Sequence, residues 1–309
     1  MKKVLKVMGV ALLVMVILIG VFLFWLTHRD ASLKENYRDE IQTGGALEAS
    51  YLKDGPYAAS YYEDPAFQVF EKYEISYPAE LETENKKYPV IVVCNGTGWK
   101  GSLSKAQHKF YASYGFIVIA TEETYSWNGF GAEMCIRHLE RLNNYQRLND
   151  KENVFYQKID FDHVGIIGHS QGGVGVLNAI TNTEHKSIYK AAVALSPTNQ
   201  QLAEALEWPY HADQITAPIL LVSGAGGGDD WVVTGEGLKE IYDQIPGDKV
   251  MMRRTNTDHG RTATAEDGYI MAWFMWQLQD DEEAARAFAG KDAEIQRNPL
   301  YQDIQIDLK

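Results

Sequence analysis

The sequence predicts an α/β protein whose mostly parallel central sheet carries helices on both faces. Short β-branched segments alternate with helical patterns over residues 70–253, as expected for strands joined by helical crossovers. Of 309 residues, 45% are hydrophobic and 23% are charged, which is enough for one large packed domain. A Gly-x-Ser-x-Gly motif directly follows one of the buried strands, at residues 168–172. The content of 45% hydrophobic and 23% charged residues excludes a disordered, collagen-like or coiled-coil chain.

The N-terminal segment is apolar and unbroken. Residues 7–27 contain no charged side chain, and a helix of this length spans about 30 Å, the thickness of a bilayer's hydrocarbon core. The run is longer than the apolar region of a secretory signal peptide, and bulky residues stand where cleavage would occur. Lysines precede it at Lys2, Lys3 and Lys6. We expect residues 1–27 to form a signal-anchor transmembrane helix of the cell membrane, with a cytoplasmic N-terminus and the rest extracytoplasmic. The alternative is a buried helix of a globular core.

The rest of the chain divides into a polar part and a patterned part. Residues 28–66 are rich in turn signals such as Asp-Gly-Pro, which predicts a tether leading into one folded domain, residues 67–309. The first expected strand, 70–77, alternates like a half-buried strand, and the second, 89–94 (PVIVVC), is typical of the middle of a parallel sheet. The further expected strands are 116–120, 163–167, 191–195, 218–222 and 249–253. The expected helices are 104–114, 132–148, 171–181 and 236–244.

Charge and cysteine content exclude several classes of function. The 29 Lys+Arg and 42 Asp+Glu give a formal net charge of −13, with no basic stripe, so nucleic acid is not an expected partner. Two cysteines, Cys94 and Cys135, cannot build a disulfide framework or a thiolate zinc site. We expect two free, buried thiols, with a disulfide between them as the alternative. The sequence has no His-Glu-x-x-His pattern, and we expect no metal site.

The motif Gly168-His169-Ser170-Gln171-Gly172 lies between an expected strand and an expected helix. A turn of this kind holds the serine in a strained conformation, and the flanking glycines avoid collisions with the neighbouring strand and helix. We therefore interpret it as a nucleophile elbow with Ser170 as the nucleophile. The alternative is a glycine-rich helix start with an inert serine.

A serine nucleophile needs a base that is oriented by a carboxylate. His259 follows the last expected strand, so its loop reaches back over the carboxyl edge of the sheet, and we expect it to be the base. The acid should follow the strand at 218–222, where Asp229 and Asp230 compete. We favour Asp230 as the acid, because one variable residue and a β-branched pair follow it.

Backbone amides and aromatic side chains complete the expected site. An oxyanion hole needs two N–H groups, which we expect from Gln171 and from Thr97 in the loop after PVIVVC. Four aromatic residues in loops at the carboxyl edge are candidate pocket walls, with ordinary loop packing as the alternative: Trp99, Trp127, Phe130 and Trp231.

Over residues 73–290 these features resemble the α/β-hydrolase family. The GHSQGG elbow, the Asn-Gly-Thr loop and the closing region 272–288 look like the branch of dienelactone-hydrolase-like and polyester-hydrolase-like esterases. The resemblance implies an α/β-hydrolase fold, hydrolysis of small-molecule or lipid-like carboxylic esters through an acyl-enzyme, and no cofactor. The chain departs from polyester hydrolases at Gln171, where they carry Met, and from dienelactone hydrolases at Ser170, where they carry Cys. Together with the N-terminal segment, the resemblance predicts a membrane-anchored serine hydrolase.

Two other functions are compatible with parts of the sequence. Residues 96–101 (GTGWKG) follow a strand, and Glu122 stands 21 residues further on, as in a dinucleotide-binding oxidoreductase. Trp99 and Lys100 would crowd a turn meant for a pyrophosphate, which disfavours that interpretation. A non-catalytic surface-binding module on the same fold would have no need for a serine, an aspartate and a histidine together.

Overall fold

The computed structural model describes residues 32–148 and 150–309. Residues 33–309 form one compact unit. The transmembrane helix expected at residues 1–27 lies outside the described residues. Among the described residues, no helix is both long and apolar enough to cross a membrane.

The described chain forms a nine-stranded sheet in the order β1-β2-β4-β3-β7-β8-β9-β10-β11. Its strands are β1 Ala59–Pro65, β2 Lys72–Pro78, β3 Tyr88–Cys94, β4 Ile117–Thr121, β7 Ile159–His169, β8 Tyr189–Leu195, β9 Ile219–Ala225, β10 Lys249–Thr255 and β11 Tyr301–Asp307. The six neighbouring strands β4, β3, β7, β8, β9 and β10 run parallel to one another. Three pairs at the two edges of the sheet are antiparallel: β1 with β2, β2 with β4, and β10 with β11. A separate two-stranded ribbon pairs β5 Arg147–Leu148 with β6 Lys151–Glu152. The predicted α/β class with a mostly parallel sheet is thus confirmed.

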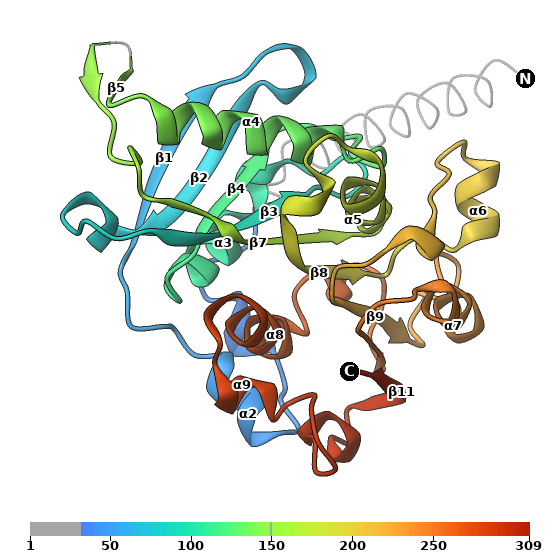
Figure 1. Cartoon of the computed structure of the whole chain (residues 1–309). Coiled ribbons are helices and arrows are strands. Elements are labelled where there is room, and N and C mark those ends of the chain that lie inside the picture. Colours follow the sequence, from blue (N-terminus) through green and yellow to red (C-terminus); the bar gives the residue numbers. More distant parts are fainter. Residues whose placement is uncertain (1–31, 149) are drawn as a thin grey trace, which may run out of the picture. The chain divides into compact units, whose positions relative to one another are not determined.

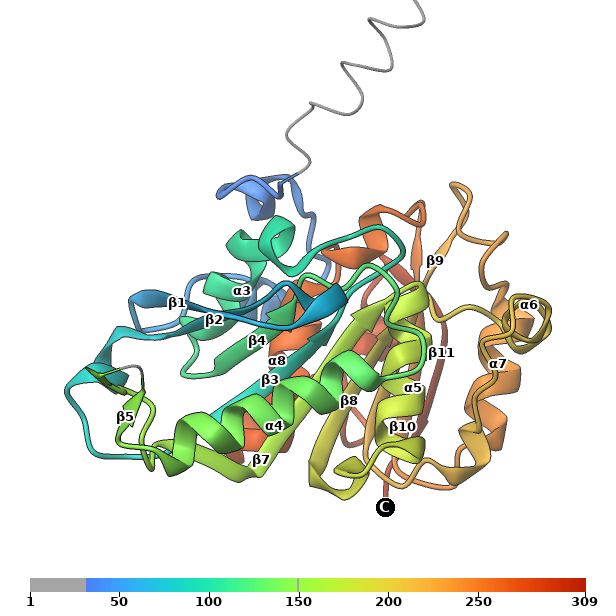
Figure 2. The same cartoon turned by 90° about the horizontal axis from the view of Figure 1, so that it is seen from above.

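Helices cover both faces of this sheet, and Figures 1 and 2 show α4 and α5 on the face opposite α8. One face packs against α4 Phe130–Asn144, α5 Gln171–Asn182, α6 Gln200–Ala205 and α7 Gly235–Gln244. The other packs against α2 Ala46–Tyr51, α3 Lys105–Ala112, α8 Asp267–Gln279 and α9 Glu282–Ala285. The 3₁₀ turns are η1 Tyr37–Glu40, η2 Gln68–Phe70, η3 Ala79–Glu82, η4 Gly101–Ser104, η5 Lys186–Ile188, η6 Ala212–Gln214, η7 Arg261–Ala263 and η8 Glu294–Arg297. Each face therefore has its own apolar core.

We expected residues 28–66 to form a tether, but the described residues of this segment are part of the fold. Strand β1 forms the edge of the sheet, and α2 packs against α8. Glu48 of α2 is buried and pairs with Arg254 of β10 (3.0 Å). The turn-rich composition concealed this packing, because the buried contacts join residues that are about 200 positions apart in the sequence.

Candidate active site

The nucleophile elbow has the geometry expected from its glycines. Strand β7 ends at His169, Ser170 has φ +59° and ψ −121°, and α5 begins at Gln171. A Cβ atom at Gly168 would lie 2.2 Å from the carbonyl oxygen of Gly172. A Cβ at Gly172 would lie equally close to a carbonyl of β3. Only glycine fits at either position, and the strained serine is held at the carboxyl edge of the sheet.

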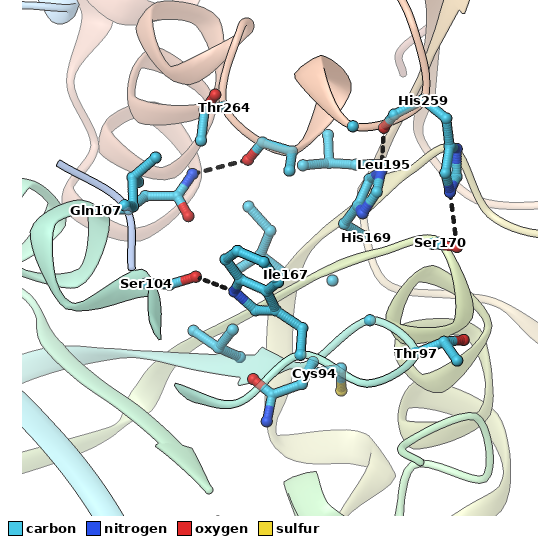
Figure 3. A pocket seen from close by; sticks show the side chains of 18 of the residues that line it. Cys94, Thr97, Ser104, Gln107, Ile167, His169, Ser170, Leu195, His259 and Thr264 are labelled. Atoms are coloured by element: carbon cyan, nitrogen blue, oxygen red, sulfur yellow. Dashed lines mark hydrogen bonds between the residues drawn. The ribbon is translucent and has the colours of Figure 1, made fainter. Parts of the chain in front are cut away.

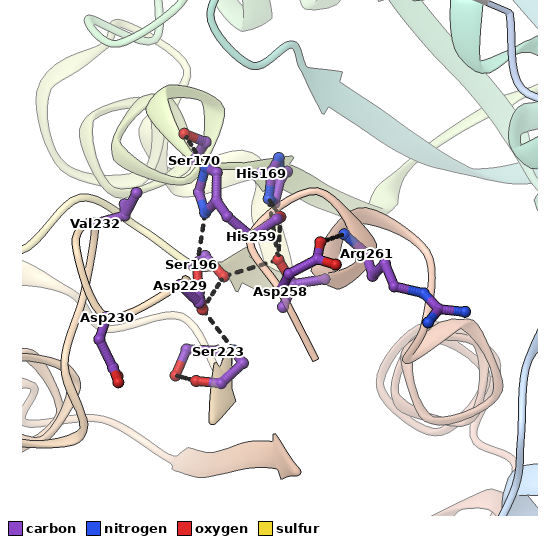
Figure 4. Close-up of polar contacts among 12 residues, drawn as sticks. His169, Ser170, Ser196, Ser223, Asp229, Asp230, Val232, Asp258, His259 and Arg261 are labelled. Atoms are coloured by element: carbon purple, nitrogen blue, oxygen red, sulfur yellow. Dashed lines mark hydrogen bonds and ion pairs between the residues drawn. The ribbon is translucent and has the colours of Figure 1, made fainter. Parts of the chain in front are cut away.

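Ser170, His259 and Asp229 form one line of hydrogen bonds, shown in Figure 4. His259 Nε2 lies 2.8 Å from Ser170 Oγ, and its Nδ1 lies 2.6 Å from Asp229 Oδ1. The three residues follow β7, β10 and β9, whose carboxyl ends meet at one edge of the sheet. The expected pairing of Ser170 with His259 is therefore present in the structure.

The carboxylate beside His259 belongs to Asp229, so the expected Asp230 is wrong. Asp229 is fully buried, and its second oxygen accepts from the Gly224 amide (2.6 Å) and the Ser196 hydroxyl (2.9 Å). The Asp230 side chain is 56% exposed and pairs with Arg253 (2.6 Å). Figure 4 shows it pointing away from His259.

The glycine loop explains this one-residue difference. The three residues 226–228 all have positive φ, which coils the chain tightly before Asp229. The amides of Val232 and Val233 then donate to the Asp229 carbonyl (2.9 and 3.1 Å). The β-branched pair does anchor the loop, but the resulting turn directs the side chain of Asp229 inward.

A second group of polar contacts involves the backbone carbonyl of His259 and holds this residue in place. His169 Nε2 lies 2.7 Å from the His259 carbonyl oxygen and 3.0 Å from Thr262 Oγ1. Thr262 also lies 2.9 Å from Ser196, which donates to Asp229. Burial lowers the pKa of His169 to about 4, so this ring is neutral and can donate to the carbonyl. Ser196 and Thr262 were not expected from the sequence, because a lone hydroxyl residue carries no pattern.

The two residues expected to form the oxyanion hole have different surroundings. Gln171 is the first residue of α5, so its amide has no partner within the helix. Its side chain is buried, and the side-chain oxygen accepts from the Ser126 amide (2.9 Å). The backbone amide of Gly98 donates to the Thr124 carbonyl (3.1 Å). The backbone amide of Thr97 has no acceptor among the described residues, so it is available to a ligand. Thr97 and Ser170 line the same pocket.

This pocket has a volume of about 500 Å³ and reaches from Ser170 toward α3. Figure 3 shows Ser170 and His259 at one end and Ser104 and Gln107 at the other. Its lining residues are mostly apolar or aromatic, as is usual for pockets that bind small molecules. Leu33, Gln107 and Tyr111 belong to the lining and were not expected from the sequence. Gln107 and Tyr111 are four residues apart on α3, and this spacing was a signal in the sequence that both side chains lie on the same face of one helix.

Two of the four expected aromatic walls are in place. Trp99 lines the pocket and donates its indole N–H to Ser104 (2.8 Å), and Trp231 lies 5.3 Å from the ring of His259. Trp127 and Phe130 are not among the lining residues. Phe130 begins α4, on the opposite face of the sheet from α3, and its ring packs 5.9 Å from that of Phe70. The expectation for Trp127 and Phe130 is therefore wrong, because the loop before α4 leads to that other face.

The residues of the dinucleotide-like motif have other partners. The Glu122 carboxylate accepts from the amide and hydroxyl of Ser102 (2.8 Å each), which holds the start of η4. A Cβ atom at Gly101 would lie 2.7 Å from the carbonyl oxygen of Thr121. Gly101, the last glycine of the motif, is therefore explained by packing of η4 against β4.

Comparison with known proteins identifies the family of the chain. A family model described as PET hydrolase-like matches residues 39–302. The chain is 27% identical to Cutinase est1 of Thermobifida alba over 250 residues, which cover 77% of this chain and 75% of the relative. Cutinase est2 of the same organism is 27% identical over 249 residues (77% and 74%). Bis(hydroxyethyl) terephthalate hydrolase of Streptomyces coelicolor is 24% identical over 215 residues (67% and 62%). The chain therefore belongs to the PET hydrolase-like family of α/β-hydrolases, and it is a carboxylic ester hydrolase.

Proposed function

We propose that the protein hydrolyses carboxylic esters through an acyl-enzyme on Ser170, with His259 as general base and acid and Asp229 as the orienting carboxylate. The observation that carries this proposal is the continuous hydrogen-bond line from Ser170 Oγ through the imidazole to the buried carboxylate (2.8 and 2.6 Å). A serine held by a histidine that a carboxylate orients is the arrangement required for nucleophilic catalysis.

The geometry supports a two-step reaction. Ser170 Oγ attacks the ester carbonyl carbon while its proton passes to His259 Nε2, and the alcohol leaves with that proton. A water molecule then attacks the acyl-enzyme and gives a proton to His259, which returns it to Ser170 as the carboxylic acid departs. Asp229 accepts from His259 Nδ1, which presents Nε2 to the serine and stabilises the imidazolium.

The amides of Thr97 and Gln171 are our candidates for the oxyanion hole. Preorganised N–H groups stabilise the charge on the tetrahedral intermediate. The Gln171 amide stands at the positive end of α5, next to the nucleophile. Because its side chain faces Ser126, we expect Gln171→Met to retain activity, since the backbone donates in either case.

We propose esters with apolar aliphatic or aromatic acyl groups, including lipid-like esters and polyester fragments, as the substrate class. The mostly apolar lining of the pocket favours such groups. Relatives carrying the names cutinase and bis(hydroxyethyl) terephthalate hydrolase support this choice.

A fluorophosphonate probe tests the nucleophile. We expect the probe to label the full chain and the Ser170→Ala variant to remain unlabelled. The variant should lose about 10⁴ to 10⁶ in kcat on p-nitrophenyl esters. Ser187→Ala, at an exposed position, is the matched control and should behave like the wild type. Undiminished esterase activity in Ser170→Ala would refute the mechanism.

We also propose that residues 7–27 anchor the enzyme in the cell membrane, with the catalytic domain outside the cytoplasm. The support is the uncharged run of 21 residues that follows three lysines. The protein should then sediment with membranes through carbonate washing, and protease added to intact protoplasts should digest the catalytic domain. Release of a product cleaved near residue 28 would instead identify a signal peptide.

A further inference from the structure

One residue outside the matched family region lines the pocket, near the Ser104 end that lies opposite Ser170. Leu33 lines the pocket, and its amide donates to the Leu103 carbonyl (2.8 Å), next to Ser104. The family match begins at residue 39. Residues 33–37, which we call the wall segment, therefore add a wall to a site that is otherwise built by the matched region.

Several contacts fasten the wall segment to the helices beneath it. The Tyr37 hydroxyl donates to Asp267 Oδ2 (2.6 Å) at the start of α8. Tyr111 and Gln107, both pocket-lining residues of α3, donate to Oδ1 of the same carboxylate (2.6 and 2.9 Å). Asp267 is fully buried, so these hydrogen bonds are shielded from water. The wall segment and the α3 side of the pocket are thus held by one shared carboxylate.

The arm of the pocket between Ser170 and Leu33 is suited to an apolar group. Its lining includes Val93 of β3, Ile167 of β7 and Leu195 of β8. These three strands are parallel neighbours, and each residue lies near the carboxyl end of its strand. The Trp99 indole N–H already donates to Ser104, so it places no unpaired donor in this arm. An aliphatic or aryl group would bury apolar surface here and gain affinity from doing so.

We infer that the wall segment sets the acyl-length limit of the enzyme, with the acyl group lying in this arm and the Leu33 side chain closing its end. The inference rests on the proposed ester hydrolysis at Ser170. The acyl group stays covalently bound until water attacks, so an enclosed arm favours it throughout the cycle. The alcohol must leave after protonation by His259, and the Trp231 side of the site, where that side chain is 69% exposed, offers an open exit.

The test compares substitutions at Leu33 with the same substitution at its exposed neighbour Lys34. Leu33→Trp, Leu33→Ala and Lys34→Trp are made in the full chain. The specificity constant kcat/KM is then measured on p-nitrophenyl esters from acetate to laurate. A second series varies the alcohol, from ethyl to dodecyl acetate.

Leu33→Trp should shift the optimum to shorter acyl groups. It should lose about tenfold or more on the longest ester that the wild type cleaves well, because a single methylene group already discriminates 10- to 200-fold. The loss should grow with acyl length and is expressed relative to acetate, because a short acyl group does not reach the wall. Leu33→Ala should shift the optimum to longer acyl groups, and Lys34→Trp should match the wild type. The alcohol series should be unchanged in all three.

Two outcomes would overturn the inference. An acyl-length profile that is the same in both Leu33 variants and the wild type would show that the segment is not a wall. A change confined to the alcohol series would place the alcohol in this arm instead. Neither outcome touches the proposed function, which fails only if Ser170→Ala keeps its activity.

Tyr37→Phe provides an independent variant, because it removes one hydrogen bond to Asp267 and leaves the pocket lining unchanged. It should loosen the wall and raise the ratio of laurate to butyrate hydrolysis, with acetate activity retained. An unchanged ratio, with the fold intact by circular dichroism, would contradict the inference even if the Leu33 variants failed to fold.

Discussion

The adjacent residues Asp229 and Asp230 show how strongly burial separates two identical side chains. Asp229 is fully buried and accepts hydrogen bonds from His259, Gly224 and Ser196. Asp230 is mostly exposed and pairs with Arg253. Only the buried carboxylate can hold the imidazole in one tautomer, because water and salt screen the exposed one.

Substitution of each aspartate by asparagine should therefore have unequal effects. Asp229→Asn should lower kcat by about 10⁴, because the histidine would adopt the wrong tautomer. Asp230→Asn should cost less than about threefold, because the Asp230 side chain is 56% exposed and does not contact His259. Steady-state kinetics on a p-nitrophenyl ester measure both, and greater damage from Asp230→Asn would contradict the assignment.

Glu123 is a buried carboxyl group whose Oε2 atom has no partner among the described residues. Burial raises its pKa from an ordinary value of 4.5 to about 7. The folded state therefore binds this proton more tightly than the unfolded state. The resulting stabilisation is complete below pH 4.5 and is lost as the pH rises through 7.

Glu123→Gln should reduce this pH dependence. Between pH 5 and pH 8, the free energy of unfolding of the wild type should fall by about 1 to 3 kcal/mol more than that of the variant. Urea unfolding at both pH values measures the difference. Glu152→Gln, at an exposed position, should follow the wild type. Equal slopes for Glu123→Gln and the wild type would show that this carboxyl group does not titrate in that range.

At the scale of secondary-structure elements, the buried pair Glu48 and Arg254 attaches α2 to the sheet. Both side chains are at most 7% exposed, and Glu48 also accepts from Tyr301 (2.8 Å) and Asn298 (2.8 Å). Such a pair specifies one position for α2, since neither charge finds an equivalent partner elsewhere. This attachment makes α2 part of the catalytic unit.

Removing one member of this pair should destabilise the fold. Arg254→Met should lower the free energy of unfolding by about 3 to 5 kcal/mol, because Glu48 would remain charged and buried. The double variant Glu48→Gln/Arg254→Met should recover part of the loss in urea titrations. Arg297→Met removes an exposed pair with Asp292 and should cost less than about 1 kcal/mol. A similar small loss for Arg254→Met would show that the pair does not hold α2.

At the scale of the whole molecule, two apolar cores on opposite faces of the sheet stabilise the described chain without a disulfide. Cys94 and Cys135 are free and buried, as predicted from the sequence. Burial raises the pKa of both thiols, which keeps them protonated and unreactive.

The melting temperature should therefore not depend on reductant. Dithiothreitol should change it by less than about 1 °C, and a thiol reagent should react with two groups only after denaturation. A drop of several degrees with reductant, together with no titratable thiol in the unfolded chain, would reveal a disulfide.

The sequence by itself determined the succession of the central strands and helices along the chain, and it identified Ser170 and His259 as the expected nucleophile and base. These are local properties: β-branched runs and helical periodicity span a few residues, and the elbow's glycines act on their immediate neighbours. Its limits are visible in β1 and α2: β1 pairs with β2 although its sequence is polar and turn-rich, and α2 is held by an ion pair between Glu48 and Arg254, about 200 residues apart.

Only the tertiary structure decided which aspartate meets His259 and which side chains enclose the pocket. Asp229 turns inward through three consecutive positive-φ glycines, a path that no residue pattern specifies. Phe130 packs on the far face of the sheet. Leu33 reaches the pocket because its amide donates to Leu103 of η4 and because Tyr37, four residues on, donates to Asp267 of α8. Such contacts join segments that are distant in sequence, and their free energy depends on the whole packed arrangement rather than on any local pattern.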